Sequence, residues 1–154
     1  MKKIKPPSPE KLTQIEAAHQ ILMQGIQLRQ NLNTALLQKC DVTLSEKELL
    51  AKIYMSGEKI RMSDVSKTLM FTEGGATKII KRLVERGFVT RQQSEQDGRV
   101  FLIDITDSGA EKLAKALETM ESVAYPLMKE TFTAKECETV TKLLKKLGAN
   151  FPEA

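Results

Sequence analysis

The sequence lacks tryptophan and has one histidine and two cysteines among its 154 residues. His19 lies in the middle of a long helical pattern, far along the chain from Cys40 and Cys137. One imidazole and two separated thiols do not supply the ligands of a common metal site. The cysteines form no C-x-x-C pair, which makes a disulfide framework unexpected. We therefore expect neither a metal nor another cofactor.

Paired catalytic groups are also lacking. The carboxylates are scattered among lysines, as on solvated helices, and no nucleophile and base stand at a suggestive spacing. The stretch GGATK at 74–78 is not a phosphate-binding loop, because that motif needs Gly-Lys-Ser/Thr after a strand. We expect that the chain is not an enzyme.

Long apolar runs are missing as well. Although 41% of the residues are hydrophobic, no run approaches the ~18 residues of a membrane span. The basic start MKKIKPPSPE is not followed by the apolar segment of a signal peptide. We expect one domain over 1–154, no membrane partner and a cytoplasmic location.

Positive charge is present and unevenly placed. The net charge is +4, and residues 77–91 alone hold five bases and one acid. Such a stripe is typical of nucleic-acid binders, although a solvated helix face has the same composition. The five bases are Lys78, Lys81, Arg82, Arg86 and Arg91.

Long amphipathic helices are expected at both ends of the chain. Apolar spacing predicts one over 8–40, started by Ser8 and Pro9. It would be about 45 Å long, whereas a compact chain of this size has a radius of gyration of about 15 Å. Its apolar stripe therefore needs a second surface. A second long pattern occupies 110–148, with Pro126 expected to kink or end its first helix and a capping box of Thr133 and Glu136 starting its last.

Shorter elements are expected between them. A capping box of Ser45 and Glu48 predicts a short helix, and Ser63 is expected to cap a second. Thr72 is expected to cap a third, from Glu73 to a terminating glycine at 87. Alternating segments at 88–93 and 100–106, joined by the polar SEQDGR, predict a β-hairpin.

Helix, turn, helix and hairpin form a winged helix-turn-helix, whose second helix enters the major groove of DNA. On that helix an apolar face is expected inward, comprising Ala76, Ile79, Ile80 and Leu83. Glu73, Gly74, Thr77, Lys78 and Lys81 are expected to face outward. Bare backbone at Gly74 and Gly75 would allow a close approach to the duplex.

Residues 45–109 resemble the multiple-antibiotic-resistance regulator (MarR) family of winged-helix repressors. The resemblance rests on TKIIKRLVERGFVTR, on DGR in the wing and on LIDITDSG after it. The last motif departs mildly from the family's Leu-Thr-x-x-Gly, with Ile105 replacing the leucine. The resemblance implies a mainly α fold with a small β-hairpin wing. Residues 8–40 and 110–148 would be dimerisation helices, and 45–107 the DNA-binding lobe.

The resemblance further implies a homodimeric repressor of a palindromic operator, released by a small-molecule effector or a redox signal. Thr77 and Lys78 would read bases, Thr72 and Lys81 would hold phosphate, and Arg99 would enter the minor groove with Asp97 orienting it. The full set of expected DNA-binding residues is Ser63, Thr72, Glu73, Gly74, Gly75, Thr77, Lys78, Lys81, Arg82, Arg91, Asp97 and Arg99.

Several alternatives stay open at this point. The lobe could be a winged-helix protein-interaction module without specific DNA binding, and Asp97-Gly98-Arg99 could be turn chemistry only. Arg82 is expected at phosphate and Arg86 in solvent. For Cys40, a packing role is favoured over oxidant sensing.

Overall fold

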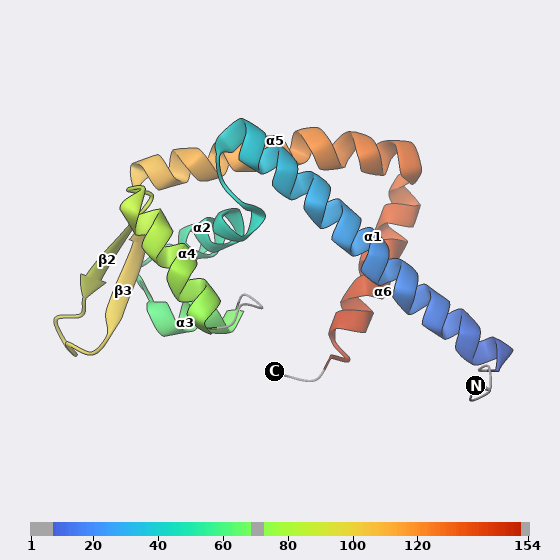
Figure 1. Cartoon of the computed structure of the whole chain (residues 1–154), viewed down its shortest axis with the longest axis horizontal. Helices are drawn as coiled ribbons and strands as arrows, with labels where there is room; N and C mark the ends of the chain where they lie inside the picture. Colours follow the sequence, from blue (N-terminus) through green and yellow to red (C-terminus); the bar gives the residue numbers. More distant parts are fainter. Residues whose placement is uncertain (1–7, 69–72, 152–154) are drawn as a thin grey trace, which may run out of the picture.

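The computed structural model describes residues 8–68 and 73–151, as a lobe of short elements attached to three longer helices (Figure 1). This mainly helical fold with a small antiparallel sheet confirms the predicted class. The elements are α1 (Pro9–Cys40), α2 (Leu44–Ser56), β1 (Ile60–Arg61), α3 (Met62–Thr68), α4 (Glu73–Glu85), β2 (Val89–Gln93), β3 (Phe101–Ile105), α5 (Asp107–Thr131) and α6 (Ala134–Gly148).

Helix α1 begins and ends where its sequence pattern predicts. Pro9 occupies its first turn, although the Ser8 side chain makes no capping hydrogen bond. Asp41 ends the helix in the left-handed conformation, with φ at 52°. Only the C-terminal part is buried, through Leu32, Leu36 and Cys40, and the rest extends away from the lobe as the blue helix of Figure 1. The apolar stripe of α1 is therefore uncovered within one chain.

The capping box of α2 differs from the predicted one. Thr43 and Glu46 form it, in place of Ser45 and Glu48: Glu46 N–H donates to Thr43 Oγ1 at 3.1 Å, and Thr43 N–H donates to Glu46 Oε2 at 2.7 Å. Both pairs fit the same spacing pattern. The earlier pair prevails because Glu46 is buried against partners from another helix, which the local sequence does not reveal.

Two other expected boundaries also shift. Ser63 does not cap α3, because that helix starts at Met62, directly after β1. Pro126 does not end α5, which continues to Thr131. Thr72 lies outside the described residues, whereas the capping box of Thr133 and Glu136 on α6 is confirmed.

The sheet has the order β1-β3-β2, and both pairings are antiparallel. The predicted hairpin is confirmed by the register of β2 with β3, from Val89 opposite Ile105 to Gln93 opposite Phe101. A third strand is added because Ile60 pairs with Ile103. Gly87, with φ at 72°, makes the left-handed turn from α4 into β2.

One apolar core joins the lobe to the long helices. Leu36 of α1 and Leu113 and Ala116 of α5 belong to the same buried cluster as the centre of the lobe. The lobe's contribution includes Leu49, Leu50, Ile53, Val65, Ile80, Leu83 and Ile103. The position of α4 is therefore fixed relative to the ends of α1 and α5 by shared packing.

Candidate nucleic-acid interface

Helix α4 presents two faces, as its periodicity predicts. Ala76, Ile80 and Leu83 are buried in the core and Ile79 packs against it. Gly74, Thr77, Lys78 and Lys81 are exposed, Gly75 is half-buried, and the side chain of Glu73 lies outside the described part. The exposed face begins with bare backbone, because a Cβ added at Gly74 would meet nothing within 4 Å.

The outer lysines are available to an anion. Lys81 Nζ lies 3.8 Å from Glu85 Oε1, with both side chains mostly exposed. An exposed i,i+4 pair at this separation contributes little to stability. A phosphate group could therefore replace the Glu85 carboxylate at small cost.

Arg82 of α4 and Arg86, directly after the helix, turn toward the preceding part of the chain. Arg82 Nε lies 3.1 Å from Glu46 Oε1. Arg86 donates to Asp41 Oδ2 at 2.8 Å and to the Asp41 carbonyl at 2.6 Å, and its side chain is 21% exposed. The expectation that Arg86 is solvated is thus wrong. Its partners lie 40 and 45 residues earlier in the chain, so local patterning could not identify them.

The wing tip is a turn held by a carboxylate. Asp97 Oδ1 accepts the backbone N–H of Arg99 at 2.9 Å, and the Asp97 carbonyl accepts the N–H of Val100 at 2.9 Å. Both Asp97 and Arg99 lie in the turn after β2, where they are exposed. Asp97 therefore orders the backbone that carries Arg99, whereas the sequence interpretation had it contact the arginine side chain.

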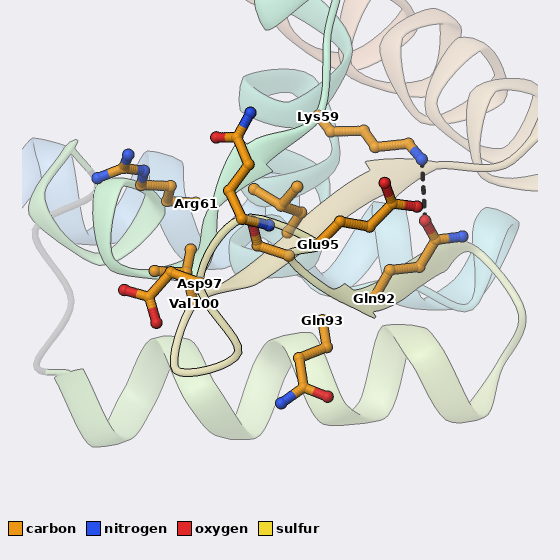
Figure 2. Close-up of a pocket in the computed structure, with 10 residues that line it drawn as sticks. Lys59, Arg61, Gln92, Gln93, Glu95, Asp97 and Val100 are labelled. Carbon is orange, nitrogen blue, oxygen red and sulfur yellow. Dashed lines mark hydrogen bonds between the residues drawn. The ribbon is translucent and has the colours of Figure 1, made fainter.

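The sides of the wing carry further bases. The Arg91 guanidinium stacks over the Phe101 ring, 3.8 Å from its centre, as a cation–π contact. Lys59 and Arg61, at the β1 segment, were not among the predicted site residues, and the two bases of the KIRM stretch are the signal that could have found them. Lys59 Nζ donates to Gln92 Oε1 at 2.9 Å across strands (Figure 2).

Lys59 and Arg61 line a cavity of about 390 Å³ beside the wing. Figure 2 shows basic, acidic and amide side chains around it. The other residues that line it are Gln92, Gln93, Ser94, Glu95, Gln96, Asp97, Val100 and Leu102. It extends the polar surface of the wing and adds no apolar ligand site.

Cys40 and the possible metal ligands are the remaining candidate groups. Cys40 is buried, with Sγ 3.1 Å from Thr119 Oγ1 and within reach of the Lys115 carbonyl. Within 8–68 and 73–151, no three His, Cys, Asp or Glu side chains converge as metal ligands would. None of the helices among these residues is long and apolar enough to cross a membrane.

The similarity to known protein sequences concerns mainly the lobe. The model of the MarR family matches residues 42–101. The uncharacterized HTH-type transcriptional regulator YdgJ of Bacillus subtilis is 30% identical over 80 residues, 52% of this chain and 48% of that protein. The organic hydroperoxide resistance transcriptional regulator of the same organism is 30% identical over 83 residues, 54% and 56% respectively. The chain thus spans about half the length of these relatives.

Solved structures extend the similarity to the flanking helices. MarR of E. coli in its apo form is 25% identical with a TM-score of 0.72, covering 94% of this chain and 98% of that one. A MarR family transcriptional regulator from Streptomyces coelicolor, in complex with DNA, is 18% identical with a TM-score of 0.81, covering 96% and 95%. At that identity the second similarity concerns the fold alone.

Proposed function

Because the chain belongs to the MarR family, we propose that it is a sequence-specific DNA-binding transcriptional regulator. The observation that carries this proposal is the exposed polar face of α4, with Lys78 and Lys81, beside a wing whose tip carries the exposed Arg99. A helix and a hairpin so placed can occupy a major groove and the neighbouring minor groove of one duplex.

The exposed residues of α4 supply the major-groove contacts. Thr77 and Lys78 lie in its first half and reach base edges, whereas Lys81, one turn further, binds phosphate. Gly74 and Gly75 let the start of the helix approach the backbone closely, where its N–H groups favour a phosphate. In the wing, Arg99 enters the minor groove from the turn ordered by Asp97.

The uncovered apolar stripes of the long helices support a homodimer. Ile15 and Leu22 of α1 are 56% and 58% exposed, and Leu143 of α6 is 60% exposed. A soluble monomer rarely leaves such stripes in water, and a second copy of the chain would bury them. Two α4 helices related by a twofold axis would then read a palindromic operator.

Repression and release complete the proposal. A dimer bound over a promoter excludes polymerase, and the natural location of such a protein is the cytoplasm. Leu36 of α1 and Leu113 of α5 share the core of the lobe, so a small-molecule or redox signal that shifts these helices would move α4 away from its groove.

The test is fluorescence anisotropy with a duplex from the region upstream of the chain's own gene, and with a scrambled duplex. We expect tight binding to the first only, falling steeply as salt rises. Lys78→Ala and Arg99→Ala should abolish the preference, whereas Lys11→Ala, an exposed lysine on α1, should not. Equally poor affinity for every sequence would refute the proposal and favour a protein-interaction module.

The state of assembly is measured separately. Light scattering at micromolar concentration should give twice the mass of one chain, 17.3 kDa. A monomer at that concentration would contradict the homodimer.

A further inference from the structure

Glu46 is a deeply buried carboxylate with two different tasks. Its side chain is 1% exposed. Oε2 accepts the Thr43 N–H at 2.7 Å and the Thr43 hydroxyl at 3.0 Å, which caps α2. Oε1 points to α4, 3.1 Å from Arg82 Nε and 3.5 Å from Arg86 Nη1. One side chain therefore starts one helix and holds another.

The contacts continue from Arg86 to the end of α1. Its Nη2 atom donates to the side chain and the carbonyl of Asp41, the residue whose left-handed conformation ends that helix. The same guanidinium lies over the Phe88 ring, 4.8 Å from its centre. Arg86 is thus bonded at the corner where α1, α2, α4 and the start of β2 meet.

Capping alone does not account for a charged residue at position 46. Glutamine serves the same role in a capping box, and burying a carboxylate is unfavourable unless cations accompany it. The charge is used by Arg82 of α4 and by Arg86 directly after its end. The Arg86 N–H donates to the Arg82 carbonyl, so the two residues are one turn apart and lie on one side of the helix end. These two ion pairs on one side add to the core packing of Ile80 and Leu83 in restricting rotation of the helix about its own axis. That rotation decides which side chains face outward.

We propose that Glu46 is a positioning residue for DNA recognition, which through Arg82 and Arg86 sets the rotation of α4 and so aims Thr77 and Lys78 at the groove. The inference rests on the proposed function. It also assigns Arg82 to the ion pair with Glu46, in place of the phosphate contact expected from the sequence. Lys81, one residue earlier, keeps the phosphate role because its side chain is 78% exposed.

The decisive variant is Glu46→Gln, with Thr43→Ala as its matched control. Glutamine keeps the side-chain acceptor of the capping box and removes the charge that holds the arginines. Alanine at position 43 removes the cap and leaves Oε1 of Glu46 facing Arg82 and Arg86. Both changes reduce stability, so the assays are run at a temperature where circular dichroism shows each variant fully folded.

The probes are a duplex that the wild-type chain selects from a random-sequence pool and a scrambled duplex of equal length. We expect Glu46→Gln to weaken binding to the selected duplex at least tenfold, with unchanged affinity for the scrambled duplex and an unchanged salt slope. Thr43→Ala should leave all three values within about twofold of wild type. Unchanged discrimination in Glu46→Gln would overturn the inference.

A phosphate role for Arg82 gives the opposite signature. Releasing Arg82 from Glu46 would then raise affinity for both duplexes and steepen the salt slope by about one, which would also overturn the inference. Arg82→Gln provides a second test, because that side chain is half-exposed and its replacement is compatible with folding. If Arg82→Gln no longer discriminates between the two duplexes and the salt slope is unchanged, the positioning role of the Arg82–Glu46 pair is supported. If affinity for both duplexes falls equally and the salt slope becomes shallower, that role is refuted.

Failure of the inference and failure of the proposed function are distinguishable. If the wild-type chain enriches no sequence from the pool, the proposed function fails. If wild type and Glu46→Gln discriminate equally, the function stands and only the positioning role of Glu46 is refuted.

Discussion

Replacing Gly109 by alanine should destabilise the fold more than a change in the first turn of a helix usually does, because Gly109 is buried. Gly109 lies in the first turn of α5, where its N–H donates to the capping Thr106 hydroxyl at 3.0 Å. A Cβ at this position would lie 2.1 Å from the Phe88 carbonyl oxygen and 2.9 Å from Ile105 Cγ1. The first of these contacts is with backbone, which cannot rotate away.

The magnitude follows from the displacement required. Ordinary contact begins near 3.4 Å, so helix and strand must separate by about 1 Å or more. Overpacking costs about 1–3 kcal/mol, and this case falls at the upper end because the Phe88 carbonyl also accepts the Thr106 N–H at 3.1 Å. Weakening that hydrogen bond adds about 1 kcal/mol to the loss of stability. The higher helix propensity of alanine offsets about 1 kcal/mol of that loss.

We therefore expect a loss of about 3 kcal/mol, equivalent to a Tm about 6–12 °C lower for a chain of this length. The assay is urea denaturation followed by circular dichroism, at one fixed protein concentration because the proposed dimer would contribute to stability. Gly74→Ala is the control: its new methyl group meets nothing within 4 Å, so stability should stay equal or rise by up to about 1 kcal/mol. Equal stability of Gly109→Ala and wild type would refute the reasoning.

Three further predictions concern other parts of the chain. Gly74→Leu should leave the fold intact but weaken binding to the operator duplex at least tenfold in anisotropy; undiminished affinity would show that the helix start is not approached. In the native chain a thiol reagent should react with the half-buried Cys137 and spare buried Cys40 until urea is added; rapid reaction at both would contradict this burial. Hydrogen bonds from Thr133 lower the pKa of Glu136, so its capping contribution is complete above the ordinary glutamate value and is lost as pH falls through the lowered one. An NMR titration of the Glu136 carboxyl would contradict this if its midpoint were ordinary.

Local patterns predict the long elements well. The start of α1 at Pro9 and its end near Cys40 follow from a helix-compatible proline and an unbroken apolar period. The outward face of α4 follows from the same periodicity, because core positions such as Ile80 leave one side free. Both outcomes depend on residues within one or two turns of each other.

Errors occur where a distant partner decides the outcome. Two overlapping capping patterns occur at the start of α2, and the ion pairs of Glu46 with Arg82 and Arg86 favour the box of Thr43 and Glu46. The role of Arg86 was missed for the same reason, since Asp41 and Glu46 come from a different part of the chain. At the wing tip, the residue pair was located correctly but the bond runs to the Arg99 backbone. Tertiary charge pairing is therefore the part of this site that periodicity does not encode.

The uncovered stripe of α1 has a consequence for how such a regulator responds to its own abundance. If subunits associate only through those helices, chains below the dissociation constant exist as single copies with apolar surface in water, exposed to proteases and unable to span a palindrome. The amount of competent dimer then rises with the square of the chain concentration. For the proposed dimer, a modest fall in synthesis would then lower the occupancy of an operator more than proportionally.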